Sequence, residues 1–190
     1  MDVRERRERR EQGVTLLELM VALTLAAILL MLAAPPLRDL VVANQAATHA
    51  QAMMTSLFLA RTEAVKRNRD VELRFNTAAP TTNWCFGTKV MDGTPCDCTV
   101  TDATAANACQ IDGVLKVVRS ADYPGVTLDA SFGGTAELAG FEPHQGLVLP
   151  GQGAGNVLVT LKADTLRIDV SLLGRVKICT TTGMPGYQPC

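Results

Sequence analysis

The feature that most constrains this chain is a long apolar stretch close to its N-terminus. Only three polar side chains interrupt the sequence between residues 14 and 37: Thr15, Glu18 and Thr24. As an α-helix this stretch would be about 36 Å long, which exceeds the roughly 30 Å hydrocarbon core of a bilayer. The sequence therefore predicts a transmembrane helix over residues 14–36.

The charges around this stretch predict its orientation. Residues 1–13 contain five arginines, and basic residues before a first apolar span favour a cytoplasmic location for that end. Residues 37–190 then form a head in the periplasm. Glu18 stands out because a lone carboxylate in hydrocarbon is costly and is usually retained for a function.

A motif at the start of the span resembles a known processing site. Gly13-Val14-Thr15-Leu16-Leu17-Glu18 is similar to the cleavage site of type IV pilins and type II secretion pseudopilins, although that family most often has Phe where Val14 stands. The resemblance implies that a prepilin peptidase removes the cytoplasmic leader, residues 1–13, by cutting after Gly13, and then methylates Val14. It also implies that Glu18 pairs with the free N-terminal amine of a neighbouring subunit and sets its axial register.

Two simpler interpretations fit less well. A secretory signal peptide needs a small-residue cleavage site after its apolar core, and a cut after Ala34 would place Pro35 and Pro36 directly behind it. A plain membrane anchor explains the length of the span but not Glu18. The basic leader, the glycine and the carboxylate together favour the pilin interpretation.

Beyond the span, the pattern predicts that the helix continues to about Asn68, with a kink at Pro35-Pro36. Over residues 37–68 apolar side chains recur at intervals of three and four residues, which predicts an amphipathic helix covering a sheet. The predicted stripe is Leu37, Leu40, Val41, Ala47, Met54, Leu57, Phe58, Ala64 and Val65. Residues 59–68 resemble the end of the helix in the GspH/FimT group of minor pilins.

Residues 71–190 have the character of β-structure. Seven short runs predict strands: Val71–Phe75, Trp84–Val90, Val114–Arg119, Val126–Ala130, Val157–Leu161, Leu166–Val170 and Arg175–Cys179. Short joints between the last three predict antiparallel neighbours. The expected fold is α+β, with one long N-terminal helix packed on an antiparallel β-sheet head, and the family resemblance implies the same pilin-like architecture.

All six cysteines lie beyond the span, in a compartment where disulfides persist. An even number favours bridges over free thiols. Cys96 and Cys98 are too close in sequence to pair comfortably, so each is expected to reach Cys85 or Cys109, and both pairings remain open. Cys179 and Cys190 are expected to form a third bridge. The spacing does not match paired zinc knuckles, so no metal or other cofactor is predicted.

No constellation of a nucleophile, a base and an orienting group is visible, so the chain is predicted not to be an enzyme. Of its two histidines, His49 lies on the predicted helix and His144 in a loop rich in Pro and Gly, and neither has an evident partner. Gly151-Gln-Gly-Ala-Gly155 resembles a phosphate loop only weakly, because it lies between strands with no helix behind it.

Gly174-Arg175-Val176-Lys177 is the one local candidate for binding outside the helix. Alternation in a strand points Arg175 and Lys177 to the same face. In the FimT branch, a similar Gly-Arg-x-Arg motif is associated with binding DNA during natural transformation. An ordinary solvated strand face explains the same residues. Outside the leader the chain carries 13 basic and 15 acidic residues, so any binding of DNA depends on a local patch.

The predicted function is therefore that of a structural minor pilin or pseudopilin of a type IV pilus or type II secretion system, with DNA uptake through Arg175 and Lys177 as the alternative. The expected partners are other pilins or pseudopilins, the prepilin peptidase and an inner-membrane assembly platform. The expected location is the bacterial inner membrane, and later a pilus or pseudopilus.

Overall fold

The computed structural model describes residues 15–77, 83–133 and 137–190. Of residues 32–39 it describes the backbone alone. Gly13 and Val14, the predicted cleavage and methylation residues, lie outside this description. One long helix, α1 (Leu16–Arg67), runs through Pro35 and Pro36 without ending there. The chain divides into two compact units, residues 1–40 and residues 41–190.

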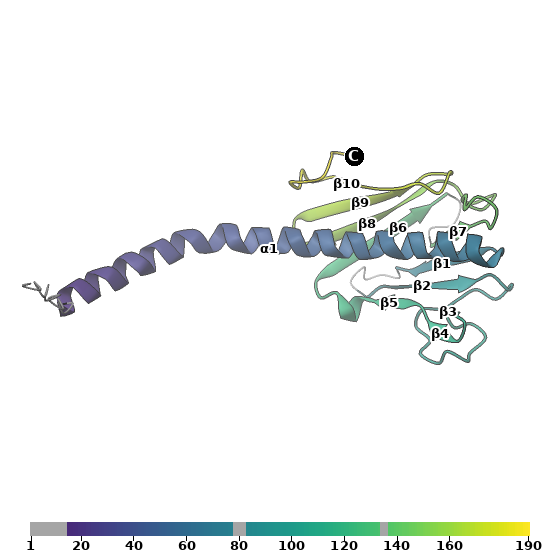
Figure 1. The fold of residues 1–190 in the computed structure, drawn as a ribbon, viewed down its shortest axis with the longest axis horizontal. Coiled ribbons are helices and arrows are strands. Elements are labelled where there is room, and N and C mark those ends of the chain that lie inside the picture. The colour runs from purple at the N-terminus through teal and green to yellow at the C-terminus, as the bar shows by residue number, and fades with distance from the viewer. Residues whose placement is uncertain (1–14, 78–82, 134–136) are drawn as a thin grey trace, which may run out of the picture. The chain divides into compact units, whose positions relative to one another are not determined.

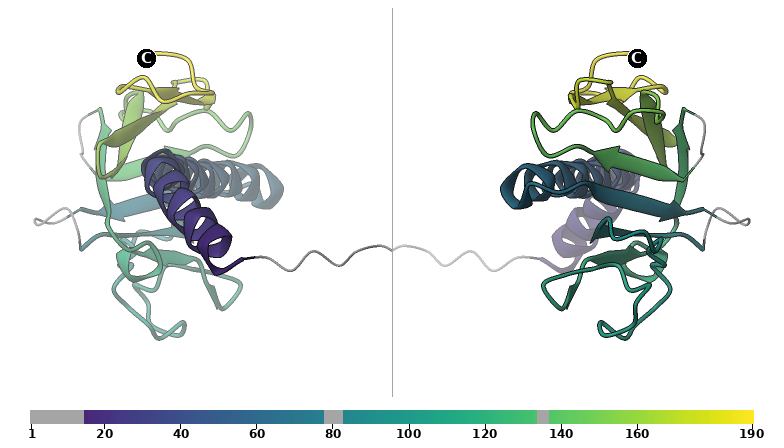
Figure 2. Two further views of the ribbon diagram at one scale, coloured as in Figure 1. Left: turned by 90° about the vertical axis from the view of Figure 1, so that its left-hand side faces the viewer. Right: turned by 90° about the vertical axis from the view of Figure 1, so that its right-hand side faces the viewer.

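The described residues after α1 form ten short strands, and eight of these strands form two antiparallel sheets of four (Figures 1 and 2). The first sheet has the order β5-β2-β1-β7 and contains β1 (Val71–Asn76), β2 (Cys85–Val90), β5 (Val117–Arg119) and β7 (Leu138–Phe141). The second has the order β10-β9-β8-β6 and contains β6 (Val126–Phe132), β8 (Gly155–Leu161), β9 (Asp164–Val170) and β10 (Val176–Thr180). A small hairpin, β3 (Gln110–Ile111) and β4 (Val114–Leu115), and a 3₁₀ turn, η1 (Ser120–Asp122), complete the fold.

The division into two sheets differs from the single sheet expected from the sequence. The chain leaves the second sheet at Phe132, and the next described strand, β7, pairs with β1 of the first sheet, with Leu73 opposite Ala139. β7 was not predicted from the sequence because its Leu-Ala-Gly-Phe run is short and does not alternate. Three of its four residues are buried.

The part of α1 within residues 41–190 covers both sheets with a face of mostly small side chains. The face repeats every three or four residues and contains Ala46, Ala50, Met53, Leu57, Ala60 and Ala64, each at most 2 % exposed. Of the predicted stripe, Leu57 and Ala64 are buried, but Leu40, Val41, Phe58 and Val65 are 39–58 % exposed. Alanine lets the helix backbone approach the strands, whereas larger side chains in the same place would hold it away. Several larger apolar residues, among them Phe58 and Val65, therefore lie beside this face and stay partly exposed.

The core is continuous between the helix and both sheets. Along β8 and β9 every second residue points inward, so that Val157, Val159, Leu166 and Ile168 are at most 1 % exposed. The intervening side chains form the outer face of the second sheet. Trp84 fills the space beside β6 and satisfies its indole N–H by donating to the Val126 carbonyl at 2.9 Å.

Candidate functional site

The start of α1 has a cap that the sequence analysis overlooked. Thr15 immediately precedes the first helical residue, and its hydroxyl Oγ1 accepts a hydrogen bond from the Glu18 backbone N–H at 3.2 Å. A Thr followed three residues later by Glu is the pattern of a capping box, which was the available signal. Glu18 lies in the first turn, where its charge is favourable near the positive end of the helix dipole.

The first turns of α1 carry large apolar side chains that are exposed. Every large apolar side chain from Leu16 to Met31 is between 50 and 78 % exposed. An apolar surface of this extent is unusual for a protein that stays alone in water. Among the residues that the structure describes, no helix has both the length and the apolar character needed to cross a membrane.

A second candidate site is a hollow on the outer face of the second sheet. It has a volume of about 380 Å³ and is lined by Ala154, Gly155, Asn156, Arg167, Asp169, Val170, Ser171, Arg175 and Lys177. The register places Lys177 of β10 opposite Asp169 of β9, and Asp169 opposite Asn156 of β8. Arg175 and Lys177, which alternation predicted to share a face, therefore line the same hollow.

The charges in this hollow are unequally paired. Nε of Arg167 lies 2.9 Å from Oδ1 of Asp169, and its Nη2 donates to Oδ2 at 3.2 Å. No ion pair within the described part of the chain involves Arg175 or Lys177, and both side chains are exposed. The hollow thus has three cations against one carboxylate. Arg167 and Asp169 were not predicted as site residues from the sequence, although alternation along β9 places both on the outer face.

A tight turn sets the position of Arg175. The Gly174 N–H donates to the Ser171 carbonyl at 2.8 Å, and the Ser171 N–H donates to the Arg175 carbonyl at 2.9 Å. Gly174 has a φ of 67°, a conformation that favours glycine. A Cβ there would also overlap the Gly146 carbonyl oxygen. The fold therefore requires glycine before Arg175, so this glycine is not evidence for a function of the arginine.

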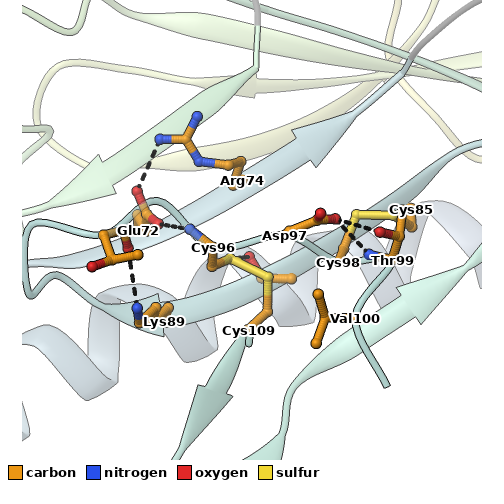
Figure 3. The surroundings of a disulfide bond; sticks show 12 residues. Glu72, Arg74, Cys85, Lys89, Cys96, Asp97, Cys98, Thr99, Val100 and Cys109 are labelled. Carbon is orange, nitrogen blue, oxygen red and sulfur yellow. Dashed lines mark hydrogen bonds and ion pairs between the residues drawn. A yellow bond between two sulfur atoms is a disulfide. The ribbon is translucent and has the colours of Figure 1, made fainter. Parts of the chain in front are cut away.

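The outer face of the first sheet is covered by residues 91–109, which two disulfides hold in place (Figure 3). Cys85 pairs with Cys98, and Cys96 pairs with Cys109, which resolves the alternatives left open by the sequence. The third bridge joins Cys179 to Cys190. Gly87 of β2 makes room for the Cys96–Cys109 bridge, because a Cβ on this glycine would lie 2.6 Å from Cys109 Sγ.

Two buried charges fasten this covering segment to the sheet (Figure 3). Glu72 is 2 % exposed, and its Oε1 accepts a hydrogen bond from the Cys96 N–H at 2.9 Å. Its Oε2 accepts one from Arg74 at 3.2 Å. Lys89 is 3 % exposed and donates three hydrogen bonds, to Asp92 Oδ1 at 2.9 Å and to the carbonyls of Thr94 and Ala106 at 3.0 and 2.7 Å. Buried charges with partners like these are structural.

Neither histidine belongs to a reactive cluster. His49 packs edge-on against Tyr123, with ring centroids 4.6 Å apart, and partial burial lowers the pKa of its imidazole. His144 is exposed in the loop after β7. Among the described residues no group of three His, Cys, Asp or Glu side chains is arranged to hold a metal ion.

Comparison with known proteins identifies two matching family models. The prokaryotic N-terminal methylation motif matches residues 9–34, which include Gly13, Val14 and Glu18. The family described as type II transport protein GspH matches residues 49–174, more than half of the chain. No curated protein sequence matches the chain.

The solved structures that resemble the chain include a minor pilin and a minor pseudopilin. The type IV minor pilin FimU of Pseudomonas aeruginosa is 16 % identical and aligns over 76 % of this chain and 95 % of its own, with a TM-score of 0.51. The minor pseudopilin EpsH from the type 2 secretion system of Vibrio cholerae is 16 % identical over 75 % of this chain and 99 % of its own, with a TM-score of 0.43. The FimU likeness supports the predicted pilin-like fold of a long N-terminal helix on antiparallel strands. By the extent of the family match, the chain belongs to the GspH family of type II transport proteins.

Proposed function

We propose that this chain is a structural minor pilin or pseudopilin that assembles into, or primes, the fibre of a type IV pilus or type II secretion system. The observation that carries this proposal is the exposed apolar surface of residues 16–31, directly behind an N-terminal methylation motif in a chain of the GspH family. That surface needs either lipid or the helices of neighbouring subunits as its surroundings. A subunit that moves from membrane to fibre uses both in turn.

The processing that this function requires begins at the leader. A prepilin peptidase cuts after Gly13 on the cytoplasmic face and methylates Val14, while the helix over residues 14–36 holds the chain in the inner membrane. Residues 37–190 form the periplasmic head, whose disulfides suit an oxidising compartment. An inner-membrane assembly platform then extracts the subunit into the fibre.

In the fibre, Glu18 sets the register between subunits. Its carboxylate pairs with the N-terminal amine of Val14 on a neighbouring subunit, which offsets a desolvation cost that neither charge could bear alone. Fixing register is the best-attested use of a buried charge in helix packing. The exposure of the Glu18 side chain in the single chain is consistent with a partner outside it.

A test must separate this role from helix capping, because Glu18 also follows the cap residue Thr15. Glu18→Ala should leave membrane insertion intact and reduce incorporation into the fibre at least tenfold, measured by immunoblotting of sheared fibres. Glu18→Gln should do the same, since it retains the shape but not the charge. Thr15→Ala, which removes the cap and leaves the carboxylate, should be incorporated nearly normally. Normal incorporation of both Glu18 variants would contradict the register role.

A second function is favoured by one observation, the unpaired cations of the hollow on β8, β9 and β10. We propose as the alternative that Arg175 and Lys177 contact the phosphates of DNA, so that the subunit acts as a receptor in DNA uptake. Lys177 would act as a point charge, whereas the arginine fork can contact a phosphate through two N–H groups. Few phosphates are neutralised per subunit, so binding is weak and salt-sensitive.

This alternative is tested by titrating a fluorescent DNA duplex with the chain and with the variant Arg175→Ala/Lys177→Ala. The measurement uses the chain lacking residues 1–13, because the five arginines of the leader would themselves attract DNA. The double variant should bind at least tenfold more weakly. Equal binding by the two proteins, or no binding by either, would remove the DNA receptor and leave the structural role in place.

A further inference from the structure

The Arg167–Asp169 pair lies on β9 and lines the basic hollow, with Asp169 between Asn156 of β8 and Lys177 of β10. Asp169 is the only acidic residue among those that line it. Its carboxylate is turned toward Arg167, with contacts of 2.9 and 3.2 Å, although Lys177 is its direct neighbour across the strands. The carboxylate thereby neutralises one of the three cations and leaves the other two unpaired.

We propose that Arg167 is a third phosphate-contacting residue of this hollow and that Asp169 attenuates its affinity for the backbone of duplex DNA. This inference rests on the second proposed function, the binding of DNA through Arg175 and Lys177. Arg167 is able to take this role because its side chain is 34 % exposed and its pairing with Asp169 is a surface pair. Such pairs are worth little, so an arriving phosphate can share the guanidinium at small cost.

The lining of the hollow favours a duplex over a single strand. No aromatic side chain lines it among the described residues, and proteins that hold single strands use aromatic side chains on which the bases stack. What remains for recognition is positive charge, together with the polar groups of Asn156 and Ser171. A duplex presents a higher density of phosphates than a single strand, so contacts of this kind favour it.

The same lining argues against an anionic membrane surface as the ligand. Surfaces that bind lipid combine basic residues with apolar side chains that enter the bilayer. Two exposed leucines, Leu172 and Leu173, lie in the turn before β10, but neither of them lines the hollow. The apolar residues that do line it, Ala154 and Val170, are small or buried, and Val170 is only 1 % exposed.

The chain offers matched controls for both residues. Asp129 is an exposed carboxylate on β6, on the outer face of the same sheet, and does not line the hollow. Asp129→Asn therefore changes the net charge as Asp169→Asn does, but outside the site. Lys162 lies in the turn between β8 and β9, at the other end of these strands from the hollow. Lys162→Gln removes one cation in the same way.

The experiment measures duplex binding by fluorescence anisotropy at several salt concentrations, with the chain lacking residues 1–13 in nonionic detergent. Asp169→Asn should bind about two- to fivefold more tightly, as expected for the loss of one surface carboxylate. Arg167→Ala should bind more weakly and reduce the slope of log K against log salt by about 0.9, the value for one lost phosphate contact. Asp129→Asn and Lys162→Gln should bind like the parent chain. A single strand of equal length should bind no more tightly than the duplex.

The outcomes separate this inference from the function on which it rests. If Arg175→Ala/Lys177→Ala abolishes binding while Asp169→Asn and Arg167→Ala match their controls, the DNA receptor stands and the role of Arg167 and Asp169 is wrong. If the parent chain binds no DNA, both are wrong. Tighter binding of the single strand would overturn the proposed contact with the duplex backbone. Binding to anionic vesicles but not to DNA, dependent on Arg175 and Lys177, would overturn the choice of ligand.

Discussion

The outer faces of both sheets carry charged residues, but the first face is covered by residues 91–109 and the second has an open hollow. On the first sheet, Glu72 and Lys89 lie beneath the disulfide-bonded segment of residues 91–109, and their charged groups are buried and hydrogen-bonded. On the second sheet, Arg175 and Lys177 stay exposed beside an open hollow. Where charges are buried and paired they hold the fold together. Where they remain exposed and unpaired they are available to a ligand.

The largest expected effect is at Lys89, whose ammonium group joins β2 to both ends of the covering segment. Lys89→Ala should lower the free energy of unfolding by about 3 to 5 kcal/mol, the range for breaking a buried charge network. The reason is that Asp92 and the carbonyls of Thr94 and Ala106 lose a common donor. Chemical denaturation of the oxidised protein measures this change. The exposed Lys162→Ala should change it by less than about 0.5 kcal/mol, and an equally small loss at Lys89 would contradict the contrast between the faces.

Lys89 also shows why this contrast was not predictable from the sequence. Alternation in Val71–Phe75 and in β2 tells which face of a strand a side chain takes, and it assigned Glu72 to the face opposite Val71 and Leu73. It does not tell whether a distant segment covers that face. The pairing of the four cysteines was undecided for the same reason, because two pairings satisfy the same spacings and only the packed structure selects one.

Helix α1 shows a second limit of prediction from the sequence. Its existence and the apolar run at its start followed from composition and periodicity, whereas the face that packs was assigned to large residues such as Leu40 and Phe58. The packed face is instead built around Ala46, Ala50 and Ala60. Periodicity weights a residue by its hydrophobicity, but close packing against strands is decided by size. Arg167 was not predicted because its interest depends on its place beside Arg175 and Lys177, which lie in the turn before β10 and on β10 itself.

The next effect concerns the bridge that holds the covering segment. Cys96→Ser/Cys109→Ser should lower the free energy of unfolding by about 3 kcal/mol, the value expected for a loop of this length. It also loosens the Cys96 N–H that satisfies the buried Glu72. The matched control is Cys179→Ser/Cys190→Ser, which opens a loop of similar length that holds only the C-terminal tail. The first loss should exceed the second, and a larger loss from opening the tail would contradict the anchoring role of Glu72.

A smaller effect is expected at Gly87, where β2 passes beneath the Cys96–Cys109 bridge. Gly87→Ala should lower the free energy of unfolding by about 1 to 3 kcal/mol, because a new methyl group would overlap the Cys109 side chain. In the variant Cys96→Ser/Cys109→Ala, which has no bridge to displace, the same substitution should cost less. A double-mutant cycle from thermal or denaturant unfolding gives the difference. Equal costs in the two backgrounds would show that the sulfur bridge is not what requires glycine at this position.

The smallest effect on stability is expected on the open face, and it completes the comparison. Arg175→Ala/Lys177→Ala should change the free energy of unfolding by less than about 0.5 kcal/mol, as is usual for surface substitutions without specific partners. Neither side chain makes an ion pair within the described residues, so their removal leaves nothing unsatisfied. If the variant is destabilised as strongly as Lys89→Ala, these cations are part of the fold, as the buried charges are. If stability is unchanged while DNA binding falls, Arg175 and Lys177 contribute to binding and not to folding.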